Sequence, residues 1–138
     1  MKKCYNNHMI KSDYIFGLLE KVAESSDHER YFLAAAITLR NSIISFGVNR
    51  MKTDPMQAKY AKNKDCIYMH AEIHAIKNAL KKVDVEDLRK ADLYVLRVRN
   101  EDGKRAMAKP CDGCMRAIAE FGIRNVYFTN ERGNAEVI

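Results

Sequence analysis

The alternation of compact apolar stretches with amphipathic ones predicts the helices and strands of this chain. Apolar residues recur at helical spacing after Ser12 or Asp13, either of which can cap a helix running to about Glu24. Compact apolar stretches follow at 31–39 and 43–49. We interpret these two stretches as strands joined by a tight turn, although the three alanines of the first are also compatible with a helix.

The middle of the chain changes from a polar segment to a second helix–strand pair. Residues 50–67 are polar and irregular, and we expect Pro55 to break any regular element there. Apolar residues at helical spacing predict a helix over about 69–82. A short charged connection at 84–90 then leads to a well-buried strand at 91–99.

The C-terminal part repeats the helix–strand alternation. Pro110 is expected to start a helix that runs through Phe121 and stops at Gly122. A strand at 125–129 follows, and a last short strand is expected at 135–138. Because only five residues separate these two strands, any pairing between them must be antiparallel.

This order of elements predicts an α/β fold with a mixed sheet covered by helices. The length of 138 residues fits one domain spanning 1–138, and we find no internal repeat. The net charge of +6 favours phosphate-bearing partners, although a solvated basic surface explains it equally well. No apolar segment is long enough for a membrane span or signal peptide, so we expect a cytoplasmic protein without a membrane partner. Its four cysteines are then expected to be thiols or metal ligands.

Two short motifs carry the candidate chemistry. Cys111 and Cys114 are two residues apart at a predicted helix start, where the helix dipole favours thiolates. His70 lies at the start of the earlier helix, with Glu72 two residues on. Two thiolates and one imidazole suit Zn²⁺, and three protein ligands leave the fourth position open to water, as in catalytic sites. Glu72 is then placed to move protons.

Two other interpretations compete with a catalytic zinc site. A redox CxxC is expected to follow a thioredoxin-like first strand, which is missing here. A purely structural zinc needs a fourth ligand, for which Cys66 and His74 are the candidates. Such a site would make the protein a nucleic-acid-binding module rather than an enzyme. We expect no role for Cys4.

Taken together, H-A-E at 70–72 and P-C-x-x-C at 110–114 resemble the signature of the cytidine/deoxycytidylate deaminase superfamily. The stretch S-F-G-V-N, ending at Asn49, is similar to a G-x-N segment of that family. The stretch from Cys114 to Phe128 resembles deoxycytidylate deaminases. The resemblance covers about 100 residues, counted from the matching stretches. It implies a cytidine deaminase-like three-layer α/β/α fold with a central mixed five-stranded sheet.

The resemblance also implies roles for individual residues. His70, Cys111 and Cys114 would bind Zn²⁺, and Glu72 would protonate N3 of the pyrimidine ring and later the leaving amine. The product would be uracil, with release of ammonia. The substrate-binding positions expected from the resemblance are Asn49 (a sugar hydroxyl), Ala71 (its backbone N–H), His74 (the edge of the pocket) and Pro110.

The sequence leaves the substrate open among three classes. Similarity after Cys114 and the positive charge favour a free nucleotide, foremost deoxycytidylate. The short C-terminal hairpin instead belongs, by resemblance, to deaminases of free cytidine or deoxycytidine. A base in tRNA or single-stranded DNA ranks third, because no groove with interleaved aromatics is evident. Family members are commonly oligomeric, so we expect a homodimer or larger assembly.

Residues outside the motifs have weaker candidate roles. Tyr60 and Tyr68 precede the first motif, and either could stack on a base. The strand aromatics are expected in the core: Tyr31, Phe32, Phe46, Tyr94, Tyr127 and Phe128. Six basic residues are candidate phosphate ligands, with an ordinary solvated surface as the alternative explanation for them. They are Lys52, Lys59, Lys62, Lys64, Arg97 and Arg99.

Overall fold

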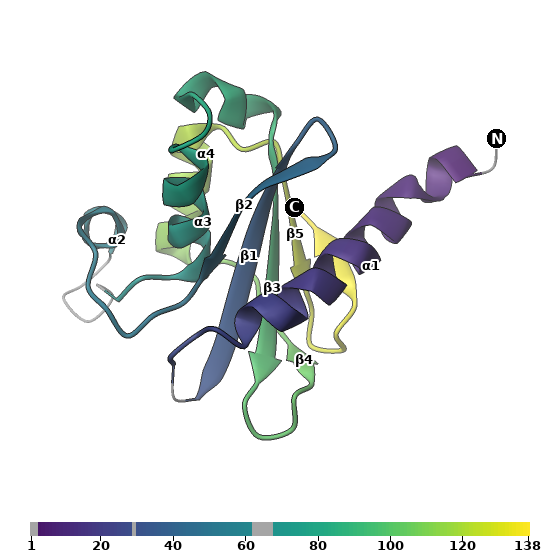
Figure 1. Ribbon diagram of the computed structural model, residues 1–138, viewed down its shortest axis with the longest axis horizontal. Coiled ribbons are helices and arrows are strands. Elements are labelled where there is room, and N and C mark those ends of the chain that lie inside the picture. Colours follow the sequence, from purple (N-terminus) through teal and green to yellow (C-terminus); the bar gives the residue numbers. More distant parts are fainter. Residues whose placement is uncertain (1–2, 29, 62–67) are drawn as a thin grey trace.

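The computed structural model describes residues 3–28, 30–61 and 68–138, with side chains from residue 11 onward (Figure 1). In chain order the elements are α1 (Lys3–Ala23), β1 (Tyr31–Leu39), β2 (Ser42–Val48), α2 (Pro55–Tyr60), α3 (Ala71–Ala79), the 3₁₀ helix η1 (Val85–Lys90), β3 (Asp92–Arg99), β4 (Arg105–Ala106), α4 (Asp112–Phe121), β5 (Asn125–Thr129) and β6 (Ala135–Val137).

The strands form one mixed sheet in the order β2-β1-β3-β5-β6. Strands β3 and β5 are parallel, and the other neighbouring pairs on this path are antiparallel. Strand β4 adds a two-residue pairing to β3. The predicted mixed five-stranded sheet is therefore confirmed, and so is the antiparallel hairpin of the last two strands.

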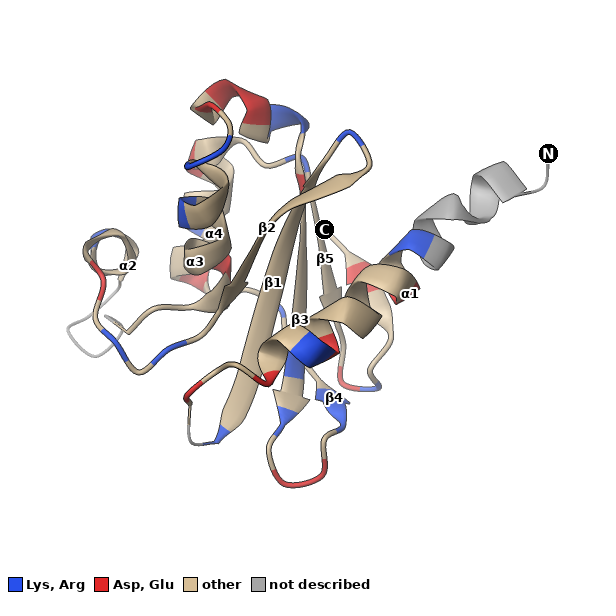
Figure 2. Cartoon of the chain, in the orientation of Figure 1, with Lys and Arg blue, Asp and Glu red and all other residues tan. Residues whose placement is uncertain are grey.

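Helices cover both faces of the sheet, and alternation along each strand decides which residues meet them (Figure 1). On β1, Ala34 and Ala36 face α1, whereas Ala35 and Ile37 face α3 and α4. Strands β1, β2 and β5 contain no charged residue, so both their faces can be buried (Figure 2). The result is the three-layer α/β/α architecture expected from the resemblance.

One glycine lets α3 lie unusually close to the sheet. A Cβ atom on Gly47 of β2 would come within 2.3 Å of the Ala75 nitrogen and 2.4 Å of the Ala71 carbonyl oxygen, both in α3. The hydroxyl of Ser45 also donates to the Ala75 carbonyl oxygen at 2.9 Å. The position of the N-terminus of α3 therefore depends on a backbone-to-backbone contact.

Several element boundaries differ from the prediction. Helix α1 begins at Lys3, well before the expected cap at Ser12 or Asp13. Pro55 does not interrupt regular structure but occupies the first turn of α2. A backbone N–H at this position would have no partner within the helix, so proline is tolerated there. Helix α4 is capped by Cys111 rather than started by Pro110, and it ends as predicted at Gly122, whose φ is 70°. Helix α3 is shorter than expected, and the two-residue β4 was not predicted.

Within the described residues, no helix combines the length and the apolar character that a membrane crossing requires.

Candidate zinc site and active site

The two sequence motifs meet at the N-termini of α3 and α4. His70 Nδ1 lies 3.3 Å from Cys114 Sγ and 3.6 Å from Cys111 Sγ. The ligand atoms of these three residues all lie within 4.8 Å of one another. In the described part of the chain, no fourth His, Cys, Asp or Glu joins this cluster.

Local structure turns the three side chains toward one point. His70 and Cys111 are the N-cap residues of α3 and α4, and both have extended backbones that project their side chains from the helix ends. The imidazole of His70 does not cap its own helix and is left to face the sulfurs. The backbone N–H of Cys114 donates to Cys111 Sγ at 3.5 Å, so the start of α4 stabilises charge on that sulfur.

The electrostatics of the cluster suit a metal ion. Hydrogen bonds from Cys114 and His70 lower the pKa of Cys111 to about 3, which favours its thiolate form. Hydrogen bonding to Cys111 and burial raise the pKa of Cys114. A tetrahedral zinc with ordinary bond lengths separates its nitrogen and sulfur ligands by roughly 3.6 Å. The distances and the donor set therefore fit Zn²⁺.

Glu72 adds a carboxyl group beside the cluster. It lies in the first turn of α3 and is only 3% exposed. Burial raises its pKa, whereas the charge of His70 opposes the shift. A closed structural zinc site has four protein ligands and needs no further carboxyl group beside them. A hydrolytic site does need such a group, because it transfers protons during the reaction.

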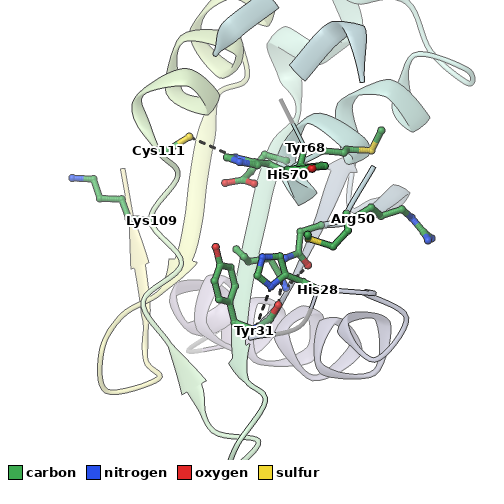
Figure 3. A pocket seen from close by; sticks show the side chains of 12 residues that line it. His28, Tyr31, Arg50, Tyr68, His70, Lys109 and Cys111 are labelled. Carbon is green, nitrogen blue, oxygen red and sulfur yellow. Dashed lines mark hydrogen bonds between the residues drawn. The ribbon is translucent and has the colours of Figure 1, made fainter. Parts of the chain in front are cut away.

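A cavity of about 350 Å³ opens over the cluster (Figure 3). Its walls come from the loop before β1, the ends of β1 and β2, and the starts of α3 and α4. The lining residues are His28, Tyr31, Leu33, Asn49, Arg50, Met51, Tyr68, Met69, His70, Glu72, Lys109 and Cys111. The size is in the range of small-molecule sites.

The structure brings some of the predicted substrate-binding residues to this cavity and places others elsewhere. Asn49 lines it, but its side chain already accepts from Ser26 Oγ at 2.5 Å and Leu33 N at 2.9 Å, and donates to the Tyr31 carbonyl oxygen at 3.3 Å. The amide therefore holds the loop before β1 in place and has one N–H left for a ligand.

His74, Ala71 and Pro110 do not line the cavity. His74 Nδ1 accepts from the backbone N–H of Val48 at 3.0 Å, which ties α3 to β2. Burial, together with the nearby charge of Arg50, lowers the pKa of His74. Ala71 is the first residue of α3 and Pro110 directly precedes the cap of α4, so both remain beside the cluster.

The lining also contains residues that were not predicted from the sequence to reach the site. Tyr31, expected in the core, forms part of the wall, as does His28, whose ring centroid lies 4.3 Å from that of Tyr31. Arg50 and Lys109 supply the cationic groups. Arg50 lies two residues after the end of β2 and Lys109 directly precedes the P-C-x-x-C motif, and these positions were the only available hint.

Among the described residues, none of the basic residues predicted to bind phosphate lines the cavity. Lys59 pairs with Glu120 at 3.9 Å, Arg99 pairs with Asp102, and the Arg97 guanidinium lies 4.2 Å from the Tyr31 ring centroid. Of the two tyrosines, Tyr68 lines the cavity, whereas Tyr60 is buried against Ile73, Cys114 and Ala117. Cys66, Lys62 and Lys64 and the side chain of Cys4 lie outside the described residues.

Fold and site together fit a zinc-dependent enzyme, with three candidate protein ligands and a neighbouring carboxyl group. The family profile described as the cytidine and deoxycytidylate deaminase zinc-binding region matches residues 9–130. The chain belongs to this family, and the resemblance inferred from the two motifs is confirmed. It is therefore a zinc-dependent deaminase of the cytidine/deoxycytidylate type.

Solved structures share the fold at low sequence identity. Cytidine deaminase from Burkholderia pseudomallei superposes with a TM-score of 0.61 at 17% identity, over 87% of this chain and 85% of that chain. The dCMP deaminase of cyanophage S-TIM5 gives a TM-score of 0.55 at 23% identity, over 89% of this chain and 84% of that chain. Comparison with curated proteins gives no match.

Proposed function

We propose that this protein hydrolyses the amino group from the cytosine of a free pyrimidine nucleotide, with deoxycytidylate as its preferred substrate. The observation that carries this proposal is the buried carboxyl group of Glu72 beside the His70, Cys111 and Cys114 cluster, at a cavity of nucleotide size. Water replaces the amine at C4 of the ring, which gives uracil and ammonia.

In this proposal, His70, Cys111 and Cys114 hold the zinc. When bound, the ion would lower the pKa of a water molecule toward neutrality and so supply the nucleophile. Glu72 would take a proton from that water and deliver it to N3 of the cytosine ring, and would later pass the second proton of the same water to the departing amino nitrogen. Backbone N–H groups at the first turns of α3 and α4, including those of Ala71 and Cys111, would orient the ring, because helix starts offer N–H groups without intrahelical partners.

The charge of the cavity supports a nucleotide over a nucleoside. Arg50 and Lys109 line it on opposite sides, with their charged ends directed outward at its rim (Figure 3), and Glu72 is the only carboxylate among the described lining residues. A phosphate-bearing substrate is attracted by such a rim, whereas a neutral nucleoside is not. A solved structure of the S-TIM5 deaminase in complex with dCMP and dUMP has a TM-score of 0.53 to this chain at 20% identity, which concerns the fold only.

One observation favours a second candidate, the free nucleosides cytidine and deoxycytidine. Strands β5 and β6 form an antiparallel hairpin. By resemblance, this ending belongs to nucleoside deaminases, whereas the nucleotide and polynucleotide branches usually insert a helix there. The walls of the cavity and the end of the sheet thus favour different substrates.

Ammonia release from a substrate panel decides between these candidates. Purified zinc-loaded protein should be assayed with dCMP, cytidine, deoxycytidine, a tRNA and single-stranded DNA, with chelator-treated protein as the blank. We expect the highest kcat/KM for dCMP. A higher value for the nucleosides would overturn the nucleotide preference, and no release from any substrate would favour a structural zinc module.

We also propose that the protein is a homodimer or larger, by analogy with its family. Analytical ultracentrifugation of the zinc-loaded protein measures this directly. Sedimentation as a monomer at micromolar concentration would contradict it.

A further inference from the structure

Helix α2 is a short element that touches the start of both helices carrying the cluster. Its residue Gln57 is 1% exposed, and Gln57 Oε1 accepts a hydrogen bond from the backbone N–H of His70 at 3.0 Å. None of the residues that line the cavity over the cluster belongs to α2. Gln57 therefore contacts the main chain of the proposed zinc histidine without reaching the cavity.

This hydrogen bond satisfies a group that α3 cannot satisfy itself. His70 is the N-cap of α3, and its N–H precedes the helix and has no partner within it. The imidazole faces the two sulfurs and is not available to hold its own backbone. The main chain at His70 is thus held from outside the helix, by Gln57.

Helix α2 is itself fixed to α3 at its first residues. The carboxylate of Asp54 caps α2 by accepting from Met56 N at 2.9 Å and Gln57 N at 3.1 Å. The same carboxylate pairs with Lys77 of α3. Burial would raise the pKa of Asp54, but the hydrogen bonds from Lys77 and the two backbone N–H groups outweigh burial and lower it.

The other end of α2 is fixed to α4. The carbonyl oxygen of Tyr60 accepts from the Arg116 guanidinium. A Cβ on Gly113 would lie 2.5 Å from that same oxygen, so the two backbones are in direct contact. One six-residue helix therefore sets the position of α3 relative to α4, and Gln57 transmits that position to His70.

We propose that Gln57 is a positioning residue for the zinc site: its hydrogen bond to the His70 backbone holds the imidazole at the right distance from Cys111 and Cys114. The inference rests on the zinc-binding role proposed for His70. Groups that orient metal ligands typically contribute about 10- to 100-fold in metal affinity or activity. Gln57 acts here on the ligand's main chain rather than on its second ring nitrogen.

The test compares two substitutions of similar size. Gln57→Met removes the acceptor oxygen and fills nearly the same volume, whereas Gln57→Glu keeps an acceptor. Zinc affinity is measured by competition with a chromophoric chelator, and ligand geometry by the visible d–d bands of the Co²⁺-substituted protein. We expect Gln57→Met to weaken zinc binding about 10-fold and shift the cobalt bands, with Gln57→Glu closer to wild type. Met56→Leu, a packing change on the same helix, serves as the control.

Wild-type affinity and cobalt bands in Gln57→Met would overturn the inference. If Gln57→Met fails to fold, hydrogen exchange in the unmodified zinc-loaded protein decides. The His70 amide should exchange as slowly as amides inside α3, and fast exchange would overturn the inference. These measurements do not use turnover, so a protein that lacks deaminase activity but shows the Gln57 effect refutes only the proposed function.

Discussion

The two faces of the sheet are built on the same strands but are packed differently. On the α1 face, large aromatic rings fill the space. Phe16 meets Tyr94 edge-to-face with 5.9 Å between ring centroids, and Tyr94 stacks on Tyr127 with 4.7 Å between ring centroids. On the α3/α4 face, Gly47 and neighbouring alanines let α3 lie close to the strands, beside larger side chains such as Ile76 and Phe128. The first face is packed through side chains, whereas the second combines side-chain packing with a near contact between the backbones of α3 and β2.

The difference explains where the chemistry lies. Backbone contacts fix the axis of a helix more tightly than flexible side chains do, and α3, like α4, begins at the cluster. Helix α1 only needs to cover apolar surface. Damage on the α1 face should therefore reduce stability alone, whereas damage on the α3/α4 face should reduce stability and activity together.

Replacing a metal ligand should have the largest effect on the α3/α4 face. Cys114→Ser removes a buried sulfur of the cluster. We expect zinc content well below one per chain and ammonia release lowered by about 10³-fold or more, the scale of losing metal catalysis. Elemental analysis and a deaminase assay measure this. Cys4→Ser, the same chemical change in α1, is the control, and full zinc content in Cys114→Ser would disprove the ligand set.

On the α1 face, Phe16→Ala should lower the free energy of unfolding by about 3–5 kcal/mol, because it empties a fully buried site. The kcat of the protein that stays folded should change less than about twofold. Urea denaturation and a low-temperature assay check both. Tyr14→Ala, at a position 65% exposed on the same helix, should change stability by under about 0.5 kcal/mol. A large fall in kcat for Phe16→Ala would show that the faces are not independent.

Two glycine substitutions compare the faces directly. Gly47→Ala should destabilise the protein by about 1–3 kcal/mol, because the new methyl group meets the backbone of α3. It should also lower kcat, since α3 must shift. Gly17→Ala in α1 meets nothing within 4 Å and should stabilise the helix by about 0.5–1 kcal/mol without affecting kcat. Thermal unfolding and steady-state kinetics distinguish these outcomes, and equal effects of the two changes would contradict the comparison.

The smallest effect is expected at the rim of the cavity. Lys109→Met removes one exposed cation from the lining. We expect the KM for dCMP to rise by about fivefold, the scale of one solvent-screened charge. The KM for deoxycytidine should not change. If the KM values for dCMP and deoxycytidine changed equally, Lys109 would not contact the phosphate of the substrate.

The sequence predicted those parts of the molecule that depend on local patterns. The compact apolar stretch at 31–39 and the segment at 125–129 were predicted as strands, and the two motifs indicated the cluster, because helix starts and ligand spacing are local features. The start of α2 was missed although Asp54 followed by Pro55 is a helix-start signal, since a proline was interpreted only as a breaker.

The rest of the site depends on contacts between distant segments, which the sequence could not predict. The hydrogen bond between Gln57 and His70 joins residues that are 13 positions apart in the sequence. The internal hydrogen bonds of Asn49 and the place of Tyr31 in the cavity wall follow from how the loop before β1 folds back on β2. Nothing in the composition of these segments distinguishes a cavity wall from a core.

The most direct test of the central claim is the Glu72→Gln variant, assayed for zinc content and ammonia release in the same preparation. Glutamine keeps the volume of the side chain but cannot transfer the proton. The account predicts one zinc per chain, an unchanged fold, and kcat lowered by about 10²- to 10⁴-fold. Unchanged ammonia release with full zinc content would contradict it.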